Sequence, residues 1–381
     1  MESEQSAEIL IIGGGLAGLV SAIHLLRAGR SVMLIEQHAY PRHKVCGEYI
    51  SNEVLPYLRS LGLDTFSFGA TSIDTLQLTT IKNKVIEAAL PLGGFGISRY
   101  TLDHELYKIA CDQGLQFIED KVTAVDYNAD RFLVTTRTER KLVATIVIGA
   151  FGKRSVLDKK IDREFAKHDA PYLAVKAHYE GDFPDHLVAL HNFKGGYCGV
   201  SKVENDAINL CYITNYQAFK KFKNIEEFQA EVLCKNSHLN EILKHARMTF
   251  ASPLSISQIS FSKKKSIEQH MLMCGDSAGM IHPLCGNGMS MAIHSAQIAS
   301  EAIIDYFLSR DRDRSTLEMT YGTRWNAAFR SRLRTGRMLA SLFRSERMSA
   351  LMLSGLKAVP ALLPRIIKAT HGEALQPFAR C

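Results

Sequence analysis

The sequence predicts a mixed α/β (α+β) fold: a Rossmann-like nucleotide-binding domain, interleaved with an antiparallel β-sheet domain and followed by a helical C-terminal tail. Three observations support this prediction. A Gly13-x-Gly15-x-x-Gly18 loop joins an apolar strand pattern to a helical pattern, residues 171–215 carry a repeated β pattern, and residues 311–381 are helical and basic. Because no internal repeat or low-complexity linker separates these patterns, we expect the domain segments to interleave.

The first forty residues form a βαβ pattern. Glu8–Ile12 reads as a short buried strand, and Leu16–Ala28 reads as a helix with Gly29 just past its end as a C-cap. Ser31–Ile35 is a second apolar strand, closed by Glu36. This unit has the length expected of half a dinucleotide-binding domain.

The rest of the chain alternates between the two predicted domains. Strands are expected within 72–97 and at Leu115–Val125, Arg131–Thr136, Lys141–Ile148, Tyr172–Tyr179, Leu187–Asn192, Tyr197–Ser201, Ala207–Thr214 and Ser266–Cys274. Helices are expected at Leu102–Gln113, 225–245, Gly288–Phe307 and after residue 311, with breaks at Pro360, Pro364 and Gly372. We assign 1–75, 98–165 and 262–310 to the nucleotide-binding domain, 76–97 and 166–261 to the β-sheet domain, and 311–381 to the tail.

Composition places the chain among ordinary globular proteins. Hydrophobic residues make up 46% and charged residues 22%, and the 8 cysteines include no CxxC pair. We therefore expect no disulfide framework and no metal site, and scattered free thiols fit a reducing, cytoplasmic compartment. The apolar stretch after Ala7 is preceded by Glu2 and Glu4, where a signal peptide carries positive charge, so we interpret it as strand, turn and helix.

The glycine loop predicts a bound dinucleotide. One of its glycines permits a tight turn, one lets the backbone approach a pyrophosphate, and one lets helix and strand pack closely. The helix that begins at Leu16 directs its positive end at the phosphates, and Glu36 is placed to bind ribose hydroxyls. FAD and NAD both use this arrangement, so the loop alone does not distinguish them.

A second glycine-rich loop favours FAD. Met273–Ala292 reads MCGDSAGMIHPLCGNGMSMA, so Gly275-Asp276 follows an apolar strand and Gly286–Gly288 precedes a helix. Asp276 can accept a hydrogen bond from a ribitol or ribose hydroxyl. Backbone N–H groups of Gly286–Met289 can face the pyrimidine edge of a flavin, where negative charge develops on reduction.

The two loops together, about 260 residues apart, resemble the single-component (group A, p-hydroxybenzoate-hydroxylase-like) FAD monooxygenase superfamily, which also contains geranylgeranyl reductases and flavin-dependent halogenases. The resemblance extends from about residue 8 to 305. It implies a Rossmann-like FAD-binding domain joined to a β-rich substrate domain. Ser98–Asp103 is similar to the arginine-plus-LD helix start of that superfamily, and Lys44–Glu48 to the loop that carries a cysteine near the flavin in geranylgeranyl reductases.

The resemblance implies a set of cofactor-binding residues. They are Gly13, Gly15, Leu16, Ala17, Gly18, Glu36, Gln37, Lys44, Cys46, Gly47, Arg99, Val122, Ala150, Gly152, Gly275, Asp276, Pro283, Gly286, Asn287, Gly288 and Met289. Cys46 and Tyr197 are the candidates for a catalytic role. His178 and His191 lie on strands that can face the cavity, but packing is the favoured interpretation for both.

Two departures from the superfamily bear on the reaction. Phe151 stands where many hydroxylases have an aspartate that contacts FAD and nicotinamide, so NAD(P)H is expected only as a transient electron donor, if at all. Halogenases of the superfamily carry a Trp-x-Trp pair, whereas this chain has one tryptophan, Trp325. A typical halogenase is therefore disfavoured.

Three functions fit these residues. We favour oxygenation of an apolar, aromatic or lipid-like substrate by a monooxygenase, with ene reduction of an isolated double bond as the close alternative. Both reactions need a cavity that excludes water from the flavin. A non-catalytic flavin-fold binding protein is the third alternative.

The tail combines an apolar stripe with positive charge. Residues 311–381 hold 13 Lys and Arg against 5 Asp and Glu, a net charge of +8. Arg330, Arg334 and Arg337 lie between the stripe residues Trp325, Phe329, Leu333, Leu339 and Phe343. The stripe can pack on the FAD-binding domain, or the tail, with Met348, Leu351, Met352 and Leu356, can touch an anionic membrane. We expect a hydrophobic substrate delivered from a membrane or a carrier protein, and no nucleic-acid partner.

Overall fold

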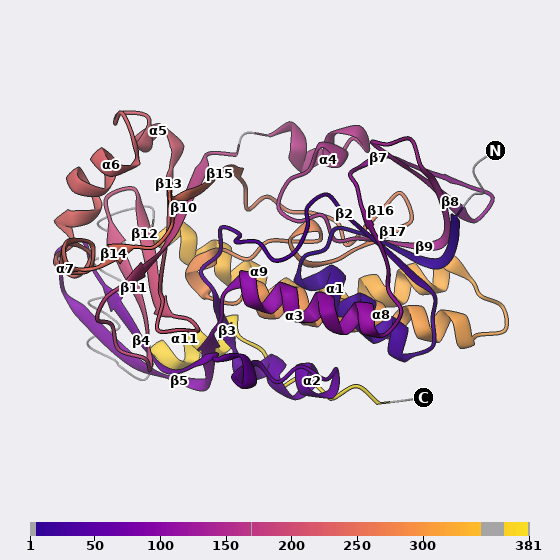
Figure 1. Cartoon of the computed structure of the whole chain (residues 1–381), viewed down its shortest axis with the longest axis horizontal. Coiled ribbons are helices and arrows are strands. Elements are labelled where there is room, and N and C mark those ends of the chain that lie inside the picture. The colour runs from indigo at the N-terminus through magenta and orange to yellow at the C-terminus, as the bar shows by residue number, and fades with distance from the viewer. Residues whose placement is uncertain (1–4, 169, 344–361, 380–381) are drawn as a thin grey trace.

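A computed structural model describes residues 5–168, 170–343 and 362–379 of the chain. Two β-sheets lie side by side along the long axis (Figure 1). The first sheet and the helices packed on it form the right-hand part of that view, and the second sheet forms the left-hand part with α5, α6 and α7 at its outer side.

The first sheet is the Rossmann-like one. Its order is β16-β17-β9-β1-β2-β6, and all neighbouring pairs from β17 to β6 are parallel. Its strands are β1 (Gln5–Ile12), β2 (Val32–Glu36), β6 (Gln116–Glu119), β7 (Val122–Asn128), β8 (Arg131–Thr136), β9 (Lys141–Gly149), β16 (Ile267–Glu268) and β17 (Met271–Met273). From β1 the chain adds β2 and β6 on one side and later β9 and β17 on the other side, and ligands bind at the carboxyl ends of strands around such a reversal.

Helices cover the first sheet and bury its strands on both faces. They are α1 (Leu16–Arg27), α3 (Arg99–Asp112), α8 (Gly288–Leu308) and α9 (Arg314–Phe343), with the shorter α2 (Leu55–Ser60) and α4 (Val156–Lys160). Burial on both faces explains why β1 and β2 read as continuous apolar runs rather than alternating patterns. The two strands predicted as single segments at 115–125 and 266–274 are each divided in two, β6 with β7 and β16 with β17.

The second sheet is mostly antiparallel, with order β14-β10-β13-β12-β11-β4-β5-β3, and β15 also pairs with β10. Only the pairing of β4 with β11 is parallel among its described strands. The strands are β3 (Tyr49–Ser51), β4 (Thr71–Thr79), β5 (Val85–Gly96), β10 (Tyr172–Glu180), β11 (Leu187–Phe193), β12 (Gly196–Lys202), β13 (Ile208–Asn215), β14 (Arg247–Met248) and β15 (Leu254–Ile259). The predicted boundary at residue 75 therefore falls inside β4, and β3 joins this sheet from within the segment assigned to the other domain.

The predicted helical segment of the second domain is divided in the structure. Residues 225–245 are helical as expected, but they form α6 (Ile225–Glu231) and α7 (Ser237–His245) rather than one continuous helix, after the short α5 (Tyr216–Phe219). Asn236 causes the break. Its Oδ1 accepts hydrogen bonds from the first backbone N–H groups of α7, while its Nδ2 donates to Thr79 on β4 at 2.9 Å. The 3₁₀ turns are η1 (Asn52–Val54), η2 (Thr65–Phe68), η3 (Glu164–Lys167), η4 (Leu233–Lys235), η5 (Gly275–Ser277) and η6 (Pro283–Cys285).

The C-terminal tail packs back onto both domains. On α9 the predicted apolar stripe is buried: Trp325, Phe329, Leu333 and Leu339 belong to the main core. The helix α11 (Leu362–Thr370) lies against β5, with Leu363 and Ile367 buried (Figure 1). Pro364, predicted as a break, instead lies within α11.

Parts of the predicted tail lie outside the described residues. They are the side chain of Phe343, and residues Met348, Leu351, Met352, Leu356 and Pro360. Within the described residues, no helix combines the length and the apolar character that crossing a bilayer requires.

Candidate functional site

The turn between β1 and α1 forms a phosphate cradle. Gly13 has φ of 106°, and a Cβ there would lie 2.5 Å from the carbonyl oxygen of Ala150. A Cβ on Gly18 would overlap the carbonyl of Gly13, so only glycine lets α1 pack this closely on β1. The N-terminus of α1 has no side-chain cap, which leaves its positive end available for an anion.

The carboxylate at the end of β2 lies beside this turn. Glu36 is buried, and one of its oxygens accepts a hydrogen bond from the Gly14 N–H at 2.9 Å. The other oxygen pairs with Arg42 at 3.2 Å. The side chain is therefore fixed where the sequence analysis expected a ribose hydroxyl.

The second glycine-rich loop faces the first. Gly275 and Gly286 have φ of 60° and 64°, values that L side chains rarely adopt. The loop ends at Gly288, where the 21-residue α8 begins, again without a side-chain cap. The side chain of Asn287 is fully buried and donates from Nδ2 to the Thr370 carbonyl at 2.9 Å, so it fastens the end of α11.

Both loops open onto one cavity of about 850 Å³, within the range of ordinary ligand pockets. All of the predicted cofactor-binding residues line it except Gly18 and Asn287. Phe151 and the catalytic candidates Cys46 and Tyr197 line it as well.

The far part of the cavity, here called the chamber, is lined mainly by aliphatic side chains from the second sheet and the tail. They include Leu76, Leu78, Leu90, Val188, Leu190, Leu254, Ile256, Leu339, Leu363, Ile366 and Ile367. The chamber therefore suits an apolar molecule that lies beside the nucleotide site.

An arginine at the start of α3 contributes positive charge to the cavity. Arg99 bonds Asp103 through Nε and Nη2, each at 2.7 Å, and Lys44 bonds the same carboxylate at 2.7 Å. Burial alone would raise the pKa of Asp103, but these two cations outweigh it and hold that pKa below its ordinary value. One buried carboxylate thus fixes two cations, Arg99 and Lys44, both of which line the cavity.

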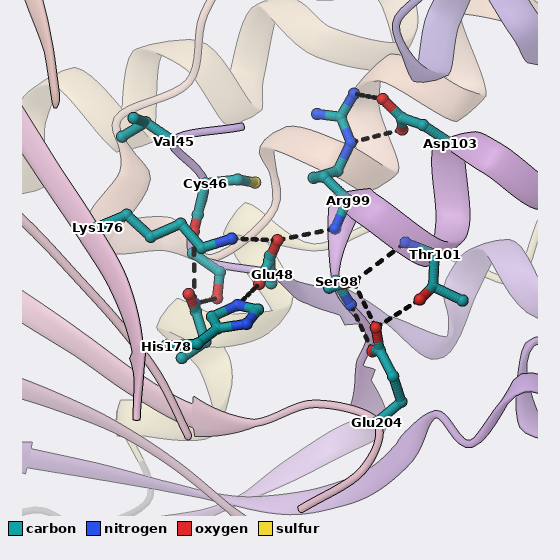
Figure 2. A network of polar contacts seen from close by, with 12 residues as sticks. Val45, Cys46, Glu48, Ser98, Arg99, Thr101, Asp103, Lys176, His178 and Glu204 are labelled. Carbon is teal, nitrogen blue, oxygen red and sulfur yellow. Dashed lines mark hydrogen bonds and ion pairs between the residues drawn. The ribbon is translucent and has the colours of Figure 1, made fainter. Parts of the chain in front are cut away.

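A polar cluster that sequence reasoning missed is centred on Glu48 (Figure 2). Its fully buried carboxylate accepts from Lys176, from His178 Nε2 at 2.7 Å and from the Arg99 backbone N–H at 2.7 Å. Burial alone raises the pKa of Glu48, but Lys176 and His178 more than offset it, so the pKa lies below its ordinary value. The cluster joins the Cys46 loop, β10 and α3.

A second carboxylate joins the domains at the same helix. Glu204, which follows β12, accepts from the Ser98 N–H at 2.8 Å, from the Ser98 hydroxyl and from Thr101 Oγ1 at 2.6 Å (Figure 2). Ser98 in turn caps α3 through the Thr101 N–H at 3.1 Å. This cap explains why α3 begins at Arg99 rather than at the predicted Leu102.

The sequence analysis identified the short motifs that contain Glu48 and Ser98, but it did not predict that these residues form the two clusters. Glu48 stood in the loop similar to that of geranylgeranyl reductases, but its side-chain partners Lys176 and His178 are more than 120 positions away. His178 does bond Glu48, and His191 bonds Thr79 at 2.9 Å; neither lines the cavity. Packing rather than catalysis thus describes both histidines.

Tyr197 lies between the second glycine-rich loop and the chamber. Its ring centroid is 6.0 Å from that of His282, next to the Pro283–Cys285 turn. Its hydroxyl is buried and has no hydrogen-bond partner among the described residues. Burial raises the pKa of Tyr197 well above its ordinary value, so the phenol stays protonated.

The geometry fits FAD. The uncapped first turn of α1 would hold the pyrophosphate, Glu36 the ribose, and the backbone at Gly286–Met289 the flavin ring. Within the described residues, no group of His, Cys, Asp and Glu is arranged to hold a metal ion, and the seven described cysteines are free thiols.

Comparisons with known proteins agree with this geometry. A family model for the FAD binding domain matches residues 6–324. The chain is 24% identical to menaquinone reductase of Mycobacterium tuberculosis, with 81% of this chain and 79% of that protein covered. It is 23% identical to digeranylgeranylglycerophospholipid reductase of Methanosarcina acetivorans, with 84% and 80% covered.

The chain is also similar to proteins that are not named as reductases. Conditioned medium factor receptor 1 of Dictyostelium discoideum is 25% identical, with 86% of this chain and 69% of that protein covered. Among solved structures, the flavin-dependent brominase Bmp2 has a TM-score of 0.80 at 18% identity, covering 96% of this chain and 93% of that one. PqsL of Pseudomonas aeruginosa, a probable FAD-dependent monooxygenase, has a TM-score of 0.72 at 15% identity, covering 92% and 100%.

Proposed function

The chain belongs to the FAD binding domain family and is an FAD-dependent oxidoreductase, and from this premise we propose that it reduces a carbon–carbon double bond in a long apolar substrate. The observation that carries the proposal is the chamber: its wall is aliphatic, and it is continuous with the nucleotide site. The names of two curated relatives, both reductases, support the same reaction class.

In this proposal the residues of the chain have two roles, substrate binding and proton transfer. FAD held between the two glycine-rich loops would, once reduced, be the source of the hydride equivalent for one carbon of the double bond. The aliphatic walls hold the substrate and exclude water. The Tyr197 hydroxyl donates the proton to the other carbon, so that the alkene gains two electrons and two protons and becomes an alkane.

Oxygenation, which the sequence analysis placed slightly ahead, is less well supported by the cavity. Aromatic hydroxylation commonly uses a base that activates the substrate hydroxyl. The aliphatic side chains that make up most of the chamber wall cannot act as a base. We therefore treat oxygen insertion as the outcome that the first experiment must separate from reduction.

That experiment is a single turnover with geranylgeraniol as the probe. Enzyme reduced by dithionite is mixed with the probe without oxygen, and in parallel oxygen labelled with ¹⁸O is admitted. Reduction predicts a product that has gained a hydrogen pair under both conditions. A product that forms only with oxygen and carries the label would overturn the proposal in favour of a monooxygenase.

The role of Tyr197 is tested by Tyr197→Phe, which removes the hydroxyl and keeps the ring. We expect flavin content to be unchanged and product formation to fall by about 10²–10⁴-fold. Tyr179→Phe is the matched control, because Tyr179 is a buried tyrosine of the same sheet that does not line the cavity. Equal rates for the two variants would remove Tyr197 from the mechanism.

We propose further that the substrate reaches the chamber from an anionic membrane that contacts the outer side of α9. Leu339 on α9 and Leu363, Ile366 and Ile367 on α11 line the chamber, so the tail forms part of its wall. Arg330 and Arg334 are exposed on α9. The tail therefore combines contact with the substrate and positive charge on its outer side.

A further inference from the structure

A second, smaller cavity lies behind the chamber. Its volume is about 250 Å³, and its own lining combines Pro91, Leu92 and Ala374 with the charged Lys368 and Glu373, all five of them exposed. Four residues line both cavities: Tyr49, Leu90, Ile367 and His371. These shared side chains therefore form a wall between the chamber and a second, partly exposed space.

Two of the four shared side chains are polar. Tyr49 on β3 and His371, just after α11, have ring centroids 6.5 Å apart and meet edge to face at 73°. The hydroxyl of Tyr49 and Nε2 of His371 are both buried without a hydrogen-bond partner among the described residues. Burying a polar atom without a hydrogen-bond partner costs free energy. The presence of two such atoms in a wall that is otherwise aliphatic therefore indicates a function other than packing.

The wall is held in place from both sides. A Cβ on Gly94 would overlap the Tyr49 ring, and one on Gly286 would lie 3.2 Å from it, so the ring fits between β5 and the second glycine-rich loop. His371 Nδ1 is 2.9 Å from the Ile367 carbonyl, and Asn287 holds the adjacent Thr370 carbonyl. The wall is therefore a fixed boundary of the chamber rather than a swinging side chain.

We propose that Tyr49 and His371 determine the chain length of the substrate by ending the chamber at this wall. The inference rests on the proposed function in one respect, that the chamber holds the substrate's apolar chain. A chain that reaches the wall buries its last carbons against the two rings, and longer chains are excluded from the second cavity.

Saturated n-alkanols of increasing length test this without any reaction, because they contain no double bond to reduce. Their dissociation constants are measured from the flavin absorbance change in the FAD-loaded protein. In the wild type, affinity rises about fourfold per methylene, equivalent to about 0.8 kcal/mol, until the chain reaches the wall. Beyond that length the affinity stops rising.

The variant His371→Ala joins the two cavities, and we expect the plateau to move to longer chains. Ile367→Ala opens the same wall from α11 and serves as a second variant, with flavin content and melting temperature confirming that each is folded. His371→Phe restores a bulky ring and should restore the wild-type limit.

A matched control fills the second cavity instead. Ala374 is exposed and lines only that cavity, so Ala374→Phe should leave the wild-type limit unchanged and cancel the gain of His371→Ala. An unchanged limit in both opened variants, or a shifted limit in Ala374→Phe alone, would overturn the proposal. Because binding is measured separately from turnover, failure of the reduction experiment leaves this result interpretable.

Discussion

The two ends of the cavity are built in different ways. The nucleotide end is made of backbone: two glycine turns, two uncapped helix starts and one carboxylate, most of it from two short segments. The chamber end is made of side chains from β4, β5, β11, β15, α9 and α11. Substitutions at the first end should act through local geometry, whereas those at the second should act through volume and polarity.

The largest effect is expected at the glycine turn. Gly13→Ala places a Cβ 2.5 Å from the Ala150 carbonyl at a positive φ, so the loop must shift away from the pyrophosphate. We expect purified protein without bound flavin, measured by its absorbance spectrum. Gly29→Ala is the control, since Gly29 also has a positive φ but a Cβ added there would meet no atom within 4 Å. If Gly13→Ala retained its flavin, the close approach of the backbone at residue 13 would not be needed for flavin binding.

The second largest effect is expected at the Glu48 cluster, which joins the two domains. Glu48→Ala leaves Lys176 buried without its carboxylate, and we expect the free energy of unfolding to fall by about 3–5 kcal/mol in urea. Glu180→Gln breaks the exposed pair with Arg247 and should change the free energy of unfolding far less, because solvent screens that pair. Similar losses in the two variants would show that the buried cluster does not join the domains.

Acid should lower the stability of both domains. Burial lowers the pKa of His24, on α1, to about 4 and that of His191, in the second sheet, to about 3. Both histidines bind protons more readily in the unfolded chain, so their contribution is complete above pH 6.5 and is lost as the pH falls towards 4. Glu48, whose pKa is lowered, loses its contribution only below its ordinary pKa.

Urea titrations at several pH values check this order. The free energy of unfolding should begin to decline as the pH falls below 6.5, above the ordinary pKa of the carboxylates. A stability that stays constant down to pH 4.5 would contradict neutral buried histidines in the folded state.

The smallest effect on the folded protein is expected at the tail's outer side. Replacing Arg330, Arg334 and Arg337 by glutamine should change the free energy of unfolding by no more than about 0.5 kcal/mol. Binding to phosphatidylglycerol vesicles should weaken by about 1 kcal/mol per arginine, whereas phosphatidylcholine vesicles serve as the uncharged control. Unchanged flotation with phosphatidylglycerol would exclude a membrane contact through these arginines.

The tail also shows where sequence patterns were sufficient and where they were not. The stripe from Trp325 to Leu339 has helical spacing, and spacing alone allowed either a packed core or a membrane face. Packing decided for the core, because α9 has the first domain beside it. Residues 225–245 are helical as predicted, but the break at Asn236 could not be predicted, because its partners lie on β4 and β11, which no local pattern contains.

The sequence by itself determined the nucleotide end, since glycine spacing, helix starts and Glu36 act over a few neighbouring positions of the backbone. It also determined the cofactor, FAD, through the second loop. Only the tertiary structure decided the Glu48 cluster, the chamber and the Tyr49–His371 wall. Each of these joins residues more than a hundred positions apart, and their contacts depend on how two sheets and a returning tail pack together.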